Sequence, residues 1–145
     1  RRDWSDIVKS GGGKPGDSRA VDEEYRKRSP VHYLRNAKGR VRLQIATGIT
    51  DGHSGSVPIS HSLLAFNEVA DVKDRIGLKE IAFMTREARL PDALERAAPD
   101  PSFGDKQPVF RRSSATAAIT IFDGGHEIIP AAAIAWMEGL YAERK

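Results

Sequence analysis

AAITIFDGGH, residues 117–126, is the stretch from which the fold of this chain can be worked out. Its first six residues are apolar or β-branched, which is typical of a strand, and Gly124 and Gly125 break that strand. The next residue, His126, then stands on a loop at the strand's carboxyl end, where open α/β sheets hold their ligands. Because histidine changes its charge near neutral pH, His126 is a candidate general base, with a surface or packing role as the alternative.

An earlier part of the chain repeats the same arrangement with an acid in place of the base. Residues 41–47 alternate between apolar and polar side chains, which predicts a second strand, and Gly48 and Asp51 follow it. A helix is expected next. Its apolar residues recur at helical spacing and predict a stripe that lies on the sheet: Ile59, Leu63, Phe66 and Ala70.

Strand, glycine, aspartate and helix, followed by strand, glycines, histidine and helix, is the order of the back half of an α/β-hydrolase. Over residues 28–72 and 115–142 the chain resembles the C-terminal end of the prolyl oligopeptidase family of serine hydrolases. The matching residues are Arg28, Ser29, Pro30, Tyr33, Leu34, Gly48, Asp51, Val57, Pro58, Ser60, Ser62, Gly125 and His126. The resemblance implies that Asp51 orients His126, which activates a serine for the hydrolysis of a peptide or ester bond.

The chain departs from the family's pattern in two respects. Val57 follows Asp51 at a greater distance than is usual in the family, so residues 52–56 form a longer, glycine-rich loop. The nucleophile elbow Gly-x-Ser-x-Gly is also missing, because the nearest match, around Ser54, fails at its last position and follows the acid instead of preceding it. We therefore expect the nucleophile on an N-terminal half of the same domain, upstream of Arg1, and no activity from this chain alone.

The glycine-rich loop suggests one further site residue. Gly52, Gly55 and the small serines of this loop let the backbone approach other segments closely, which would place His53 near the rim of the pocket. His53 is therefore a candidate substrate-binding residue. A metal site formed by His53, Asp51 and His126 is an alternative, although no spacing among the three preorganises it.

Residues 73–114 lie outside the resemblance and are predicted to be a helical insertion. An amphipathic pattern favours a helix over residues 78–89, and residues 109–112 are consistent with a short strand. The insertion is expected either to overhang the catalytic edge or to be a peripheral excursion. A last helix is expected over residues 130–141, with Ile134, Met137 and Tyr141 on one stripe and small alanines that permit close approach to the sheet.

Composition limits the remaining classes of function. The net charge of +3 comes from 23 basic and 20 acidic residues that are interspersed, whereas nucleic-acid-binding proteins usually cluster their basic residues. The sequence has no cysteine, which excludes disulfides and a thiolate nucleophile, and no apolar run long enough to span a membrane. No cofactor is indicated. The compartment is left open, including a secreted or periplasmic location directed by an upstream signal.

The sequence thus predicts an α/β fold in two parts. Residues 1–27 are a polar, glycine-rich N-terminal segment, and residues 28–145 are the C-terminal part of an α/β-hydrolase catalytic domain. The strand at 41–47 would leave an open edge through which the chain could form oligomers. A non-catalytic binding module and a carbohydrate or acyl esterase on the same fold are the alternative functions.

Overall fold

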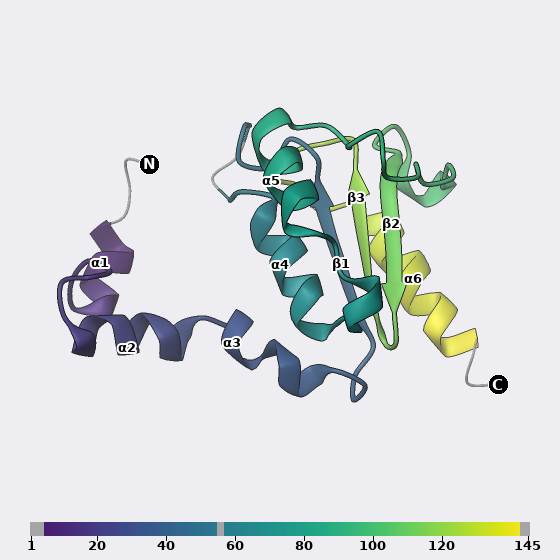
Figure 1. Cartoon of the computed structure of the whole chain (residues 1–145). Helices are drawn as coiled ribbons and strands as arrows, with labels where there is room; N and C mark the ends of the chain where they lie inside the picture. Colours follow the sequence, from purple (N-terminus) through teal and green to yellow (C-terminus); the bar gives the residue numbers. More distant parts are fainter. Residues whose placement is uncertain (1–4, 55–56, 143–145) are drawn as a thin grey trace.

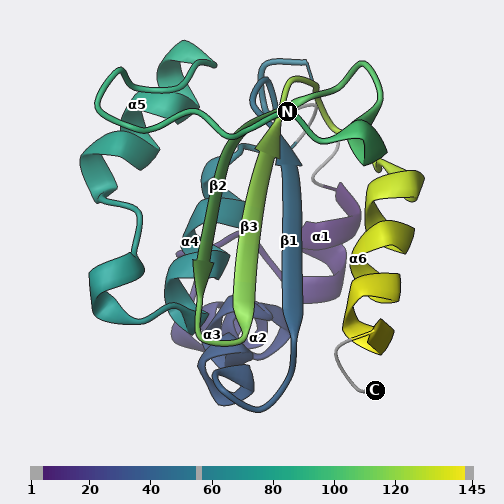
Figure 2. The same cartoon turned by 90° about the vertical axis from the view of Figure 1, so that its right-hand side faces the viewer.

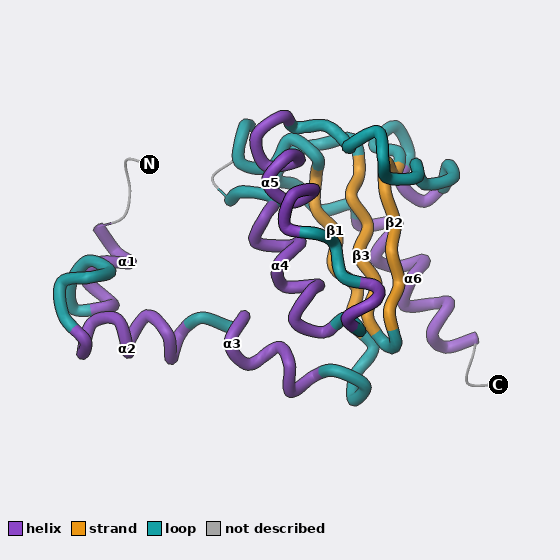
Figure 3. Tube along the Cα trace, viewed as in Figure 1, coloured by secondary structure: helices purple, strands orange, loops and turns teal. Residues whose placement is uncertain are grey.

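A three-stranded mixed sheet forms the centre of the computed structural model, which describes residues 5–54 and 57–142 (Figure 3). The strands are β1 (Leu43–Gly48), β2 (Pro108–Ser114) and β3 (Ala117–Phe122). Their order is β1-β3-β2, with β1 parallel and β2 antiparallel to β3. The α/β class expected from the sequence is therefore present, built on a small sheet.

The register of β1 against β3 determines where the functional loops lie. Leu43 stands opposite Ala117 at one end of the pair and Gly48 opposite Phe122 at the other, so the two strands begin and end together. Because the strands are parallel, the loop after each of them emerges at the same edge of the sheet. This edge receives Asp51 from one loop and His126 from the other.

Two helices, α4 (Ser60–Val69) and α5 (Leu78–Glu87), lie on one side of the sheet (Figure 1). The stripe predicted for the first of them is confirmed, because all four of its residues are buried at 1% exposure or less: Ile59, Leu63, Phe66 and Ala70. They pack into one core with Ile119 and Ile121 of β3, which are completely buried. The apolar face of the central strand is thus covered by α4.

The last helix, α6 (Pro130–Ala142), lies on the opposite side of the sheet from α4 (Figure 1). The expectation that its apolar stripe packs on the sheet is wrong, because Ile134, Met137 and Tyr141 are 51%, 47% and 71% exposed. Seen face-on, α6 runs along the outer edge of β1 (Figure 2). The α6 residues that line the cleft between helix and sheet are others: Ala132, Ala135, Trp136, Gly139 and Leu140. No described strand pairs with the outer edge of β1.

The segment 73–114 is more than a helical insertion. It contains α5 and a short 3₁₀ turn, η3 (Pro101–Phe103), and it ends in β2, which is longer than the strand expected at 109–112. Because β2 forms an antiparallel hairpin with β3, this part of the segment belongs to the sheet. A second 3₁₀ turn, η2 (Val72–Asp74), leads into the segment from α4.

The N-terminal part of the chain is helical. It comprises α1 (Ser5–Gly11), α2 (Arg19–Arg28), α3 (Val31–Leu34) and a 3₁₀ turn, η1 (Arg35–Ala37). In Figure 1, α1 and α2 lie away from the sheet, while residues of α3 and η1 reach α4. None of the helices in the described part of the chain is both long and apolar enough to cross a membrane.

An ion pair ties η3 to β2 and makes the stability of the chain depend on pH. The hydroxyl and backbone N–H of Ser102 and the guanidinium of Arg111 all bond to the Asp100 carboxylate. The Ser102 side chain, then Arg111, lower the pKa of Asp100 from 3.8 to about 2. The charged form is thus favoured in the folded state, so its contribution is complete above about pH 4 and disappears as the pH falls towards 2.

We expect Asp100→Asn to lower the free energy of unfolding by about 1 kcal/mol at pH 6, a value discounted for the partial exposure of the ion pair. The deficit relative to the unsubstituted chain should shrink through the pH range 4 to 2, where the native carboxylate loses its charge. Urea unfolding at several pH values measures both. A deficit that stays constant down to pH 2 would contradict this origin.

Candidate functional site

An acid and a base meet at the carboxyl edge of the sheet. Asp51 Oδ1 lies 3.1 Å from Nδ1 of His126, although the two residues are 75 positions apart in the chain. The two side chains differ in exposure, with Asp51 9% exposed and His126 57% exposed. A buried carboxylate thus contacts one nitrogen, Nδ1, of an accessible imidazole.

The sequence predicted this proximity from the strand ends, and the distance confirms it. Asp123, the competing aspartate three residues before His126, has its backbone N–H bonded to the Gln107 carbonyl oxygen. The acid that contacts His126 is Asp51.

The backbone brings the two loops together at Gly48. A Cβ atom added there would lie far inside the van der Waals radii of the Gly124 carbonyl group. The ladder then continues past the strand ends, because Ile49 N–H donates to the Phe122 carbonyl oxygen at 2.8 Å. Glycine at position 48 is therefore required by close approach of the second loop, and not by its own dihedral angles.

Thr50 joins the loop after β1, which carries Asp51, to the loop after β3, which carries His126. Its backbone N–H and its hydroxyl both donate to the Gly124 carbonyl oxygen, at 3.0 and 2.7 Å. The hydroxyl of Ser54 lies 3.2 Å from that of Thr50 and close to Gly125, which leaves no room for a side chain at Gly125. These bonds connect the residue before Asp51 to the residue two positions before His126.

The loop after Asp51 turns sharply, and Gly52 makes the turn possible. Its φ angle of +89° lies in the left-handed region, which glycine adopts without steric penalty, and a Cβ atom there would also crowd Pro58. The N–H of Ile59 then donates to the Asp51 carbonyl at 3.2 Å, so the start of α4 is joined to the acid. Residues 55 and 56 lie outside the described part of this loop.

His53 makes a contact that its sequence position did not indicate. Its Nε2 lies 2.9 Å from the Thr85 carbonyl oxygen in the last turn of α5. The side chain is exposed, and the loop is thereby joined to α5. The role of His53 in binding substrate stays a prediction.

The segment 73–114 reaches the edge of the sheet at a second point. Lys106 lies 3.6 Å from the Glu127 carboxylate, and that carboxylate accepts a hydrogen bond from Gly125 N–H at 3.1 Å. Together with the Thr85 contact, this places parts of the segment next to both loops at the carboxyl edge of the sheet. The segment therefore borders the candidate site.

A metal centre has no support from the geometry. Among the residues that the structure describes, no group of three His, Asp or Glu side chains is placed to hold an ion. His53 is turned towards α5, while Asp51 and His126 contact each other. The described loops thus bring two of the three proposed ligands together without the third.

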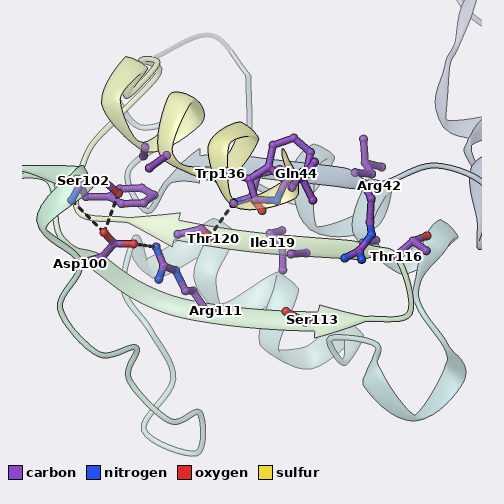
Figure 4. Close-up of a pocket in the computed structure, with 18 of the residues that line it drawn as sticks. Arg42, Gln44, Asp100, Ser102, Arg111, Ser113, Thr116, Ile119, Thr120 and Trp136 are labelled. Atoms are coloured by element: carbon purple, nitrogen blue, oxygen red, sulfur yellow. Dashed lines mark hydrogen bonds and ion pairs between the residues drawn. The ribbon is translucent and has the colours of Figure 1, made fainter. Parts of the chain in front are cut away.

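A cleft of about 470 Å³ lies elsewhere, on the face of the sheet beside α6 (Figure 4). It is lined by both polar and apolar residues of the strands and their flanking turns, and by Trp136 of α6. Gln44 donates to the Thr120 hydroxyl across its floor, and Asp100 and Arg111 pair at one end. None of its lining residues belongs to the Asp51 or His126 loops, so the cleft is separate from the candidate site.

Two residues of the site were missed by the sequence reasoning. Thr47 donates to the second oxygen of Asp51, and Thr50 bridges the loops. Both lie within four positions of the predicted acid, and a polar residue at the end of an apolar strand was the available signal. Comparison of the chain with protein-family models, curated proteins and solved structures found no match.

We expect Gly48→Ala to destabilise the fold by about 1–3 kcal/mol, the usual cost of an overpacked site, because the new methyl group collides with the backbone at Gly124. Gly139→Ala is the matched control, since its added Cβ meets no atom within 4 Å and α6 should gain slightly from alanine. Urea unfolding of both variants measures the difference. Equal stability of the two would show that the loops do not meet as described.

Proposed function

We propose that this chain supplies the acid and the base of a Ser-Asp-His triad in a serine hydrolase of peptide or ester bonds, of the kind found in the prolyl oligopeptidase family. The observation that carries the proposal is the 3.1 Å contact between Asp51 Oδ1 and His126 Nδ1 at the carboxyl edge of two parallel strands. The order of acid and base along the chain agrees with that of α/β-hydrolases. Its sheet and helices are also of the α/β class.

In this proposal each side chain has its own task. Asp51 accepts a hydrogen bond from the Nδ1–H group of His126. This bond fixes the tautomer in which Nε2 carries no hydrogen and can act as the base. Nε2 removes the proton of the serine hydroxyl as its oxygen attacks the carbonyl carbon, and the buried carboxylate stabilises the imidazolium. The same proton then passes to the departing amine or alcohol. Water repeats the sequence on the acyl-enzyme and restores the serine.

The serine itself is proposed to come from an N-terminal half of the same domain, outside residues 1–145. No Gly-x-Ser-x-Gly occurs in the sequence, and the order of elements places such a turn ahead of β1. The oxyanion hole would come from the same half. A non-catalytic module that has lost its nucleophile is the second candidate, and it is favoured only by that missing motif.

The outer side of β1 supports the presence of such a neighbour. In the described part of the chain β1 pairs only with β3, so its other edge carries unpaired backbone groups. A groove of about 310 Å³ runs beside this edge, lined by apolar side chains that include Ala46, Ile129 and Met137. A further strand paired with β1 would lie in this groove and cover Met137.

In a protein that includes the nucleophile, Asp51→Asn should lower kcat for a chromogenic ester by about 10⁴-fold, because the amide cannot hold the required tautomer. Asp123→Asn is the matched control, since this acid lies three residues before His126 and makes no bond to it, and turnover should be unchanged. Equal effects of the two substitutions would contradict the triad. A fluorophosphonate probe should label the complete protein and leave residues 1–145 unlabelled, Ser54 included.

Self-association of residues 1–145 should proceed through the open edge of β1. Leu43 and Ile49 N–H groups donate towards β3, so alternation along the strand turns the N–H groups of Gln44 and Ala46 outwards. Ala46→Pro removes an outward donor without breaking the ladder with β3, and it should reduce the dimer or oligomer fraction.

Sedimentation velocity at several concentrations measures this fraction. Ile45→Pro is the contrasting variant, because it deletes an inward donor and should unfold the sheet instead. An unsubstituted chain that stays monomeric at all concentrations, or an Ala46→Pro chain that associates as before, would show that the edge is not the contact surface.

A further inference from the structure

The carboxylate of Asp51 is held by two partners, one on each oxygen. Oδ1 contacts His126, and Oδ2 lies 3.0 Å from the hydroxyl of Thr47. Thr47 is 3% exposed and Asp51 is 7% exposed, so the bond between them is shielded from water. An ionised carboxylate can only accept, and therefore the threonine hydroxyl is the donor.

Thr47 belongs to the sheet itself, because it lies in a strand that is paired with β3. It lies within β1, opposite the completely buried Ile121 of β3, whereas Asp51 lies on the loop that follows. Threonine also has few accessible χ1 rotamers because it is branched at Cβ. The hydroxyl is thus a fixed donor that projects from the sheet to a carboxylate on a loop.

We infer that Thr47 is a positioning residue for the pair formed by Asp51 and His126, an inference that rests on the hydrolase function proposed above. The terminal torsion of an aspartate is broad, so a single contact with His126 leaves the carboxylate free to rotate. The Thr47 bond removes that freedom by engaging the opposite oxygen. Oδ1 is then kept in the orientation that accepts from Nδ1.

The alternative is that the Thr47 hydroxyl has only a structural role, like any buried hydroxyl that forms a hydrogen bond. Thr120 of β3 represents that role, because it is 2% exposed and its hydroxyl accepts a bond from Gln44 on the face of the sheet lined by the cleft. Thr47 differs in that its partner is the acid of the site. Thr120→Val is therefore the matched control for Thr47→Val.

The test is the tautomer of neutral His126, measured by ¹⁵N NMR on residues 1–145 at alkaline pH. In the unsubstituted chain the form with hydrogen on Nδ1 should predominate, because Asp51 accepts that hydrogen. Thr47→Val should lower the ratio of Nδ1–H to Nε2–H forms by roughly 2- to 10-fold, the range expected for one net hydrogen bond. Thr47→Ser, which keeps the donor, should restore most of the ratio, and Thr120→Val should leave it unchanged.

Asp51→Asn separates this inference from the proposed function. If Asp51→Asn abolishes the preference for Nδ1–H while Thr47→Val leaves it intact in a folded chain, the pair exists and the role of Thr47 is overturned. If Asp51→Asn leaves the tautomer ratio unchanged, the pair itself fails, and the inference fails with it. The hydrolase proposal fails on different evidence, namely unchanged ester turnover of the complete protein bearing Asp51→Asn.

A measurement without substitution decides the matter if Thr47→Val does not fold. The Thr47 hydroxyl proton should exchange slowly with water and couple to the Asp51 carboxyl carbon, as expected for a buried donor. Ser113, which is exposed, supplies the fast-exchanging reference. A Thr47 hydroxyl that exchanges as fast as that of Ser113 would overturn the inference.

Discussion

The parallel pairing of β1 with β3 is the interaction on which the rest of the structure depends. Six residues of each strand lie in register, and the ladder continues to the bond between Ile49 N–H and the Phe122 carbonyl. Because both strands end at one level, the two loops that carry Asp51 and His126, 75 positions apart in the chain, emerge side by side. Gly48 then allows the second loop to approach closely enough for Asp51 to reach His126. A register shift of one residue would turn the strand faces over and separate the pair.

Most of this arrangement could be predicted from short-range pattern. Apolar spacing located the α4 stripe correctly, and the position of Asp51 and His126 after two strands predicted their contact. The sequence did not show that β2 joins the sheet, because hairpin pairing with β3 depends on contacts outside the strand itself. Thr47 was missed for a related reason. Its hydroxyl matters through its contact with Asp51, four residues later on a loop whose turn depends on Gly52.

The exposed face of α6 was also predicted wrongly, and the cause is informative. Helical spacing predicts which residues share a stripe, but it does not predict whether anything lies opposite the stripe. Ile134 and Met137 remain about half exposed, beside an edge of β1 that no described strand occupies. An apolar helix face and an open strand edge at one place are each costly to leave in water. One further strand, as proposed above, would pair the open edge and cover Met137 in the groove beside it.

The contrast in exposure between the acid and the base follows from the same geometry. Asp51 lies close to the end of β1, where Thr47 and the start of α4 cover it, while His126 projects from a loop held mainly by backbone contacts with Thr50. A carboxylate removed from water interacts more strongly with an imidazolium than an exposed one does, provided that its own hydrogen bonds are satisfied. Both oxygens of Asp51 meet that condition. The site therefore combines a fixed, shielded acid with a base that a nucleophile on another segment could reach.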